Sequence, residues 1–468
     1  MVSRKMKSYS QFSIPRNGSS HVPSWAFHVS PLWRWSHQNT PNQVFVSASG
    51  RFFLVMSVLA LLLVPAIRAQ SKDEAPRVTF DEEANYYSKA IADGPVARLQ
   101  QRIEQGQANL KYDPTWGYLL SILDELKVPE SSQILAFSKT SAQRERISPT
   151  TPRAIYFNHE VYLGWIPGSP TLEISCVDPK LGAVFYTMEQ RETAKPRIVR
   201  NDQCLECHTS SRTMGVPGYL VRSFVTDENG VVDLGHGISL VDHRTPIVAR
   251  WGGWYVCGTH GSQIHLGNLI GAKAFERQKV ESNYLGNLTE LSRFFDTSKY
   301  PQPTSDIVAL MVLEHQARMQ NSITRLNYDA TVASKERGDT SQLRDRALAF
   351  LKYLLFVEET PFVSPINGPS DFARRFESQG PTDKQGRSLR QFDLQTRLFK
   401  YPCSYMIYSE AFDSLPREMK LMLYSRLWKI LSGTDSDPAF QKIPEETKRA
   451  IRDILIETKP DIPRYWTL

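Results

Sequence analysis

The chain has 468 residues and a formal net charge of +7, with apolar residues making up 41% of it. Residues 1–69 supply seven Lys and Arg and no Asp or Glu, so the rest of the chain is neutral. This balance excludes nucleic acid as an expected partner, because nucleic-acid binding needs a basic surface. The length exceeds that of one typical domain, which predicts more than a small electron-carrier module.

The first element along the chain is an N-terminal leader. Residues 52–66 form an apolar run after Arg51, and the small residue Ala69 follows at the position of a cleavage site. Residues 51–69 therefore read as the core of a signal peptide within a leader of residues 1–69. The run is shorter than the roughly 20 apolar residues of a membrane span. We expect export to the periplasm, with an uncleaved leader acting as a membrane anchor as the alternative.

Three regions follow the leader, and their patterns predict an α+β fold. Residues 70–148 and 276–468 read as helical, and they flank a β-rich central region at residues 149–275 that carries the cofactor motif described below. In the first region, the spacing of apolar residues predicts a helix over 114–127. The helices expected in the last region cover residues 305–337, 341–358, 415–431 and 444–457.

Short aromatic and β-branched runs, separated by Asn, Gly, Pro and Asp, predict the strands of the central region. These strands are expected at residues 154–157, 161–166, 171–177 and 183–188. Residues 221–226 and 231–234 flank Asn229-Gly230, which predicts a hairpin with an Asn-Gly turn.

The most specific motif is Cys204-Leu205-Glu206-Cys207-His208, which reads C-x-x-C-H. This spacing is typical of the attachment site of a c-type haem. Two thiols add to the vinyl groups of the porphyrin, and the adjacent His supplies an axial nitrogen to the iron. The motif therefore predicts one covalent haem c held by Cys204 and Cys207, with His208 as the proximal iron ligand.

Two other uses of the cysteine pair remain open at this point. A thioredoxin-like redox pair should follow a buried strand, but residues 195–203 do not read as one. A structural zinc site in a secreted binding protein could use Cys204, Cys207, Cys257 and His260 as a tetrahedral set. The other cysteines, Cys176, Cys257 and Cys403, are odd in number, which predicts at least one free thiol or an intermolecular pairing.

Three histidines are candidates for the distal side of the iron. His260 and His265 lie in residues 251–268, a segment dense in Gly and aromatic residues that suits close approach to a flat cofactor. The alternative for both is a tight hairpin with hydrogen-bonded histidines. His315 lies on an apolar stripe of a predicted helix, where a satisfied core histidine is the alternative.

Other side chains near the motif have weaker claims. Met214 is only six residues from His208, too close to reach the opposite face of a haem, so we expect it to serve packing. Arg212, Arg222 and Arg250 flank the motif and the aromatic segment, and they could pair with haem propionates.

The motif and the leader together resemble secreted bacterial c-type cytochromes. Most of the chain after the leader, including residues 158–165 and 251–268, resembles a group of large exported proteins with a single haem. The first resemblance implies haem binding, electron transfer, and attachment of the haem outside the cytoplasm by the cytochrome c maturation machinery. The second covers more of the chain but implies no reaction.

The sequence thus predicts a periplasmic monohaem c-type protein that passes electrons to or from redox partner proteins. The alternative is a haem oxidoreductase with an open sixth iron position that acts on peroxide or a small oxo-species. The surplus length favours this alternative, because carrying electrons does not require so long a chain.

Overall fold

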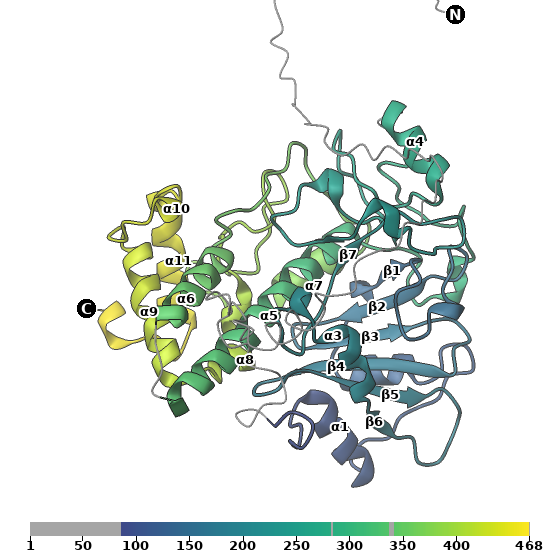
Figure 1. The fold of residues 1–468 in the computed structure, drawn as a ribbon, viewed down its shortest axis with the longest axis horizontal. Helices are drawn as coiled ribbons and strands as arrows, with labels where there is room; N and C mark the ends of the chain where they lie inside the picture. Colours follow the sequence, from purple (N-terminus) through teal and green to yellow (C-terminus); the bar gives the residue numbers. More distant parts are fainter. Residues whose placement is uncertain (1–85, 282–283, 337–340, 468) are drawn as a thin grey trace, which may run out of the picture. The chain divides into compact units, whose positions relative to one another are not determined.

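An antiparallel sheet of seven strands forms the centre of the fold in the part of the chain that the structure describes (Figure 1). The structure is a computed structural model, and it describes residues 86–281, 284–336 and 341–467. The predicted leader at 1–69 lies outside the described residues. The strands of this sheet are β1 (Ile134–Ala136), β2 (Arg153–Phe157), β3 (Val161–Trp165), β4 (Thr171–Asp178), β5 (Gly182–Glu189), β6 (Ile198–Arg200) and β9 (Trp254–Tyr255). Two further strands, β7 (Arg222–Ser223) and β8 (Ser239–Leu240), pair with each other in a separate sheet.

Helices precede and follow the sheet in sequence, which confirms the predicted α+β class. The helices are α1 (Pro95–Glu104), α2 (Leu119–Glu125), α3 (Leu205–His208), α4 (Ala272–Val280), α5 (Ile307–Glu336), α6 (Ser341–Leu354), α7 (Phe372–Ser378), α8 (Glu410–Asp413), α9 (Arg417–Leu431), α10 (Pro438–Gln441) and α11 (Glu445–Thr458). Strand β1 lies inside the range that the sequence predicts as helical.

The order of the strands places two functional segments at opposite edges of the sheet. From β1 to β6 each strand pairs with the next in sequence, and β9 then joins the free side of β1. The C-x-x-C-H motif follows edge strand β6, whereas the aromatic segment at 251–268 contains the other edge strand, β9. The topology therefore separates the starting points of these two segments by the width of the sheet.

Opposite faces of the central strands have different partners. Tyr162 of β3 pairs with Ser175 of β4, which pairs with Phe185 of β5, so these three side chains share one face. Tyr219 lies against this face, with its ring centroid 4.3 Å from that of Tyr162. On the other face, α1 packs so closely that a Cβ on Gly94 would lie 2.8 Å from the sulfur of Cys176.

The long helix α5 lies across the turns at one end of the strands. Gln320 donates a hydrogen bond to the His159 carbonyl in the β2–β3 turn at 2.8 Å. Further along the helix, Tyr328 donates to the Leu181 carbonyl beside the β4–β5 turn at 2.9 Å. Helix α5 therefore satisfies backbone groups that the turns leave unpaired.

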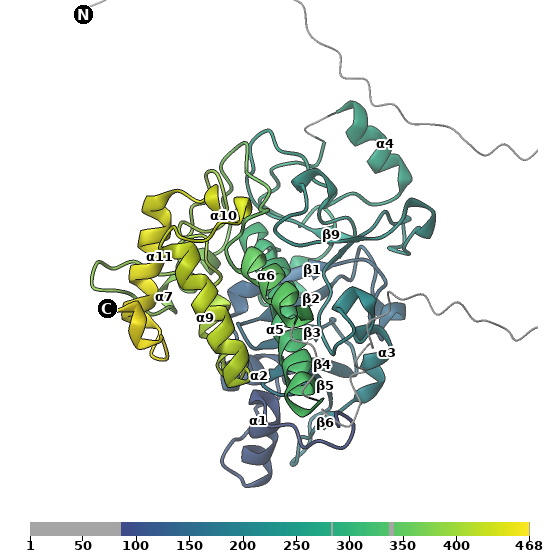
Figure 2. The same cartoon turned by 60° about the vertical axis from the view of Figure 1, so that its left-hand side comes forward.

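The C-terminal helices pack beside α5 and extend the core away from the sheet (Figure 2). Helix α6 contacts α5, α9 contacts α6, and α11 contacts α9. Their inward positions are apolar and buried, as in Leu351, Leu427 and Ile454. The four helices expected in this region are all present, with ends that differ from the expected ones by a few residues.

The predicted hairpin is shorter than expected. Its two segments are joined across the turn at residues 227–230 by a single antiparallel bridge, Thr226 to Val232, with backbone hydrogen bonds on either side of it. The Asp227 side chain accepts hydrogen bonds from two nearby amides, including that of Val231 at 2.8 Å. The expected ladder does not extend further, because Arg222 and Ser223 form β7, which pairs with β8.

Candidate functional site

The C-x-x-C-H motif forms a short helical segment directly after β6. A single 3-10 turn, Asp202–Cys204, leads into α3, and the Asn201 side chain accepts a hydrogen bond from the Gln203 amide at the start of that turn. Leu205 is buried, Cys204 is half-buried and Cys207 is exposed. Local hydrogen bonding and one apolar anchor thus place both thiols and the histidine on consecutive turns of one segment.

His208 is held by a backbone carbonyl. Its Nδ1 lies 2.8 Å from the carbonyl oxygen of Gly218, and the Gly218 amide donates to the His208 carbonyl at 2.9 Å. Because a carbonyl only accepts, Nδ1 carries the proton and Nε2 carries the lone pair. Burial lowers the pKa of His208 below its usual value, which keeps the ring neutral at pH 7. Metal-ligating histidines commonly have this arrangement, with one nitrogen held and the other left for the metal.

The position of Gly218 depends on α5. Asn321 accepts a hydrogen bond from the Tyr219 amide and donates one to the Tyr219 carbonyl, both at 2.8 Å. A Cβ on Gly218 would lie 2.3 Å from Oδ1 of Asn321, so this close approach requires glycine. Sequence reasoning missed both residues, although Pro217-Gly218 shortly after the motif marks a turn.

The sheet supplies one wall beside His208. The Phe185 ring lies 4.7 Å from the His208 ring, and Tyr219 lies 6.1 Å from Phe185. These rings fix the plane of the imidazole by packing, in addition to the hydrogen bond from Nδ1.

The two motif thiols are not bonded to each other, and all five cysteines are free. Burial, aided by the carboxylate of Glu173, raises the pKa of Cys204 to about 11. Thiols of redox-active Cys-x-x-Cys pairs instead have lowered pKa values. The surroundings of Cys204 therefore do not favour a thiol–disulfide catalyst.

Charged groups around the motif have incomplete partners. Arg153 and Glu173 form an ion pair at 2.5 Å, yet Nε of Arg153 and Oε1 of Glu173 are buried with no hydrogen-bond partner among the described residues. Burial and the neighbouring Arg212 lower the pKa of Arg222. Neither Arg212 nor Arg222 forms an ion pair with a described carboxylate. Two cations without counter-charges fit the propionates of a haem held at Cys207.

The third arginine candidate, Arg250, has a different role. It is buried and pairs with Glu314 of α5, and its Nε donates to the Thr245 carbonyl at 2.7 Å. Trp251 donates to the other carboxylate oxygen of Glu314 at 3.0 Å. With its donors used inside the core, Arg250 is not placed to pair with a propionate.

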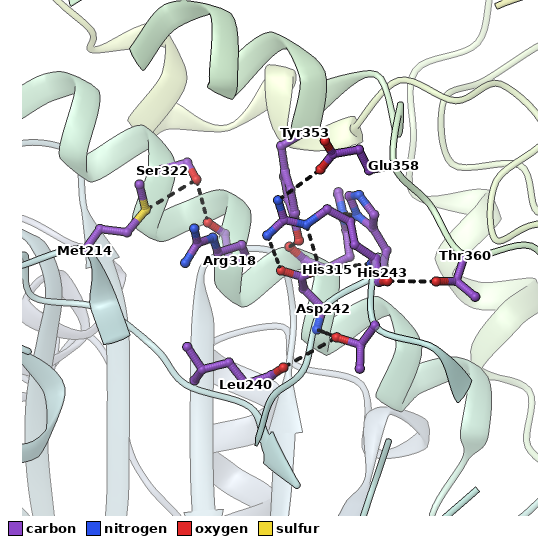
Figure 3. Close-up of polar contacts among 12 residues, drawn as sticks. Met214, Leu240, Asp242, His243, His315, Arg318, Ser322, Tyr353, Glu358 and Thr360 are labelled. Carbon is purple, nitrogen blue, oxygen red and sulfur yellow. Dashed lines mark hydrogen bonds and ion pairs between the residues drawn. The ribbon is translucent and has the colours of Figure 1, made fainter. Parts of the chain in front are cut away.

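Met214 lies in the loop after the motif, and its side chain contacts α5. It has a left-handed backbone with φ of 64°, and its sulfur accepts a contact from the Ser322 hydroxyl at 3.7 Å (Figure 3). This contact ties the loop to α5 on the same side as Asn321.

His315 is a core histidine with both ring nitrogens engaged. Its Nδ1 lies 2.8 Å from Nδ1 of His243 (Figure 3). Its Nε2 lies 2.8 Å from the hydroxyl of Ser404. Rings of Tyr353 and Phe356 stack beside it. Burial lowers the pKa of His315 to about 3. His315 is therefore the hydrogen-bonded core histidine that the sequence left open as the alternative to an iron ligand.

His260 and His265 lie together in the loop after β9. Their rings meet edge to face with centroids 4.7 Å apart. Nε2 of His260 accepts from the Asn287 amide at 2.9 Å, and Nδ1 of His265 accepts from the Gly267 amide at 2.9 Å. Both side chains are buried; His265 is hydrogen-bonded within its own loop and His260 to the segment that follows α4, as histidines with a structural role would be.

The side chains of the zinc alternative are not brought together. Cys257 is fully buried, and its sulfur accepts from the Ser305 amide at 3.4 Å, at the β9 side of the fold. Within the described residues, no group of three or more His, Cys, Asp or Glu side chains is arranged to hold a metal ion. Cys204 and Cys207 are thus not joined there by Cys257 and His260.

Comparison of the chain with protein-family models, with curated proteins and with solved structures found no match. None of the helices in the described ranges has the length and apolar character needed to cross a membrane.

Proposed function

We propose that this chain is an exported c-type haem protein that binds one covalent haem at Cys204 and Cys207. The observation that carries the proposal is the pairing of His208 with Gly218, which holds Nδ1 and leaves the lone pair of Nε2 for iron. The haem supplies the one-electron chemistry of its iron. The chain's own residues attach it, orient the axial ligand and balance its charge through Arg212 and Arg222.

The role we propose is electron transfer with redox partner proteins in the periplasm. Attachment there would require the cytochrome c maturation machinery, and the leader would direct the export. His208, packed on Phe185 and held through Nδ1 by Gly218, would be the residue that ligates the iron, and these contacts would hold its ring in place.

A second candidate function is a haem oxidoreductase with an open sixth position. The observation that favours it is that none of the three distal candidates presents a free lone pair: His315 is engaged through both nitrogens, and His260 and His265 each accept a hydrogen bond through one nitrogen, so the other nitrogen carries the proton. An iron with only His208 as a protein ligand would bind peroxide or a small oxo-species.

The test is an absorption spectrum of protein matured in a host with the cytochrome c assembly machinery, oxidised and then reduced, with and without carbon monoxide. Sharp reduced bands that carbon monoxide does not move would support the electron carrier. Bands that shift would support the open site. Folded protein without c-type bands would contradict both functions.

A further inference from the structure

His236 has a ring nitrogen that no described residue uses. The side chain is exposed, and it ends the 3-10 turn Leu234–His236. Its Nδ1 lies 2.9 Å from a carboxylate oxygen of Asp233. Because a carboxylate only accepts, Nδ1 carries the proton, and Nε2 of the neutral ring carries the lone pair. Nε2 makes no hydrogen bond with a residue in the described ranges, so its lone pair is free for a metal.

The Asp233 carboxylate that holds His236 is itself fixed. Its other oxygen accepts a hydrogen bond from the Gly235 amide at 2.9 Å, and the Asp233 amide donates to the Val225 carbonyl at 2.9 Å. Gly237 follows with φ of 78°, and a Cβ there would meet no atom within 4 Å. Asp233 therefore orients the ring, and the space beside Gly237 is open. Metal-ligating histidines commonly donate their second ring nitrogen to a carboxylate in this way.

The turn belongs to a two-stranded ribbon that lies next to the C-x-x-C-H motif. Strand β8 follows the turn and pairs with β7, so that Leu240 lies opposite Arg222. Arg222 interacts electrostatically with Arg212 and with Cys207 of the motif. One strand pair therefore connects the His236 turn to the surroundings of the motif.

Contacts with α5 give the same placement. Met214, in the loop after the motif, contacts Ser322 at 3.7 Å (Figure 3). Asp242, two residues after β8, interacts electrostatically with Arg318, which lies one helical turn before Ser322 (Figure 3). The loop after the motif and the end of the ribbon therefore lie along neighbouring turns of the same helix.

The side chains exposed around the turn suit a haem. Val231, Leu234 and Leu240 are 48%, 71% and 40% exposed, and such a group of large apolar side chains within ten residues is typical of a binding surface. Arg212 and Arg222 add positive charge that no described carboxylate neutralises. A haem has an apolar ring and two propionates, so it matches both features.

We propose that Nε2 of His236 is the sixth ligand of the haem iron, opposite His208. The proposal rests on the covalent haem of the proposed function. A porphyrin iron bound to His208 needs only one more protein nitrogen, so a cluster of three protein ligands is not required. Two histidine ligands would fill both axial positions, which favours the electron carrier over the open site. If His236 only closes its turn, replacing it will leave the coordination of the iron unchanged.

The experiment is electron paramagnetic resonance of the oxidised protein, matured in a host with the cytochrome c assembly machinery. Wild type should give a low-spin signal. His236→Ala should keep its covalent haem, because Cys204 and Cys207 are unchanged, but it should become mostly high-spin, and added imidazole should restore the low-spin signal. The control is His159→Ala, which replaces a partly exposed histidine beside Glu160 in the β2–β3 turn and should leave the low-spin signal unchanged.

A ligand exchange gives a second readout. His236→Met retains a side chain that can bind iron, and the midpoint potential should rise because methionine ligation raises the potential of a haem. A low-spin signal that persists in His236→Ala, a wild-type signal that is already high-spin, or an unchanged potential in His236→Met would overturn the assignment of His236. Intact mass separates that failure from failure of the proposed function, since folded wild type without covalent haem would overturn both.

Discussion

His208 and Gly218 are joined by two hydrogen bonds that run in opposite directions. The His208 ring donates to the Gly218 carbonyl at 2.8 Å, and the Gly218 amide donates back at 2.9 Å. The pair connects the motif to the following loop, and Asn321 of α5 connects that loop to the core. The orientation of the imidazole thus depends on a helix more than 100 residues away in sequence.

Substitution of Gly218 tests this connection. In Gly218→Ala the added Cβ would meet Oδ1 of Asn321 at 2.3 Å, so the loop must move. We expect a loss of about 1–3 kcal/mol in the free energy of unfolding, measured by urea denaturation. The control is Gly235→Ala at an exposed position, where the nearest atom is the flexible Asp233 side chain at 3.1 Å. A loss no larger than that of the control would mean that Gly218 is not held as described.

Reactivity of the cysteines should follow their burial. In the chain without haem, a thiol reagent should modify exposed Cys207 first and Cys204 more slowly, because burial raises the Cys204 pKa to about 11. The three fully buried thiols, Cys176, Cys257 and Cys403, should react only on unfolding. Peptide mapping by mass spectrometry reads out the order. In matured protein, protection of Cys204 and Cys207 is expected as well, and rapid modification of Cys257 in the folded chain would contradict the structure.

Stability should decrease on acidification. Burial lowers the pKa of His265 and of His315 to about 3 in the folded chain, against about 6.5 when unfolded. Between these values the unfolded state binds more protons, so the free energy of unfolding falls as pH drops from about 6.5 toward 3, and above 6.5 these groups contribute no slope. Urea midpoints at several pH values measure this dependence.

His315→Gln should reduce that dependence on pH. The comparison uses the slope of stability against pH, which is informative even where the His315 variant is less stable at neutral pH. Equal slopes in wild type and His315→Gln would show that His315 is not buried as a neutral group.

The buried ion pair of Arg250 and Glu314 provides a further prediction. Both side chains are almost fully enclosed, at 2% and 0% exposure. Glu314→Gln removes the negative charge and leaves Arg250 unpaired, with an expected cost of about 3–5 kcal/mol. The exposed pair of Arg277 and Glu281 is the control, and Glu281→Gln should cost less than about 0.5 kcal/mol. Chemical denaturation of both variants gives the comparison, and a cost for Glu314→Gln as small as the control's would contradict the buried pair.

Periodic patterns predicted much of the fold. The helix expected at 305–337 is α5, Ile307–Glu336, and the four strands expected between 154 and 188 are β2 to β5. These elements have strong helical or alternating patterns that tertiary contacts reinforce. The hairpin after residue 221 is shorter than expected because Arg222 and Ser223 of its first segment pair with β8.

Partners that are distant in sequence could not be predicted. The stripe of α5 placed His315 in the core, but His243 and Ser404, which occupy its nitrogens, are 72 and 89 positions away. The spacing of residues along the chain is enough to identify the C-x-x-C-H motif. The burial and the partners of each other candidate side chain depend on contacts that form only in the folded chain.

The most direct measurement is the intact mass of the protein matured in a host with the cytochrome c assembly machinery, recorded after denaturation in acid. We expect the mass of the chain plus one haem, and the mass of the bare chain for a variant in which Cys204 and Cys207 are both replaced by Ser. A wild-type chain that is folded yet carries no covalent haem would contradict haem attachment at Cys204 and Cys207.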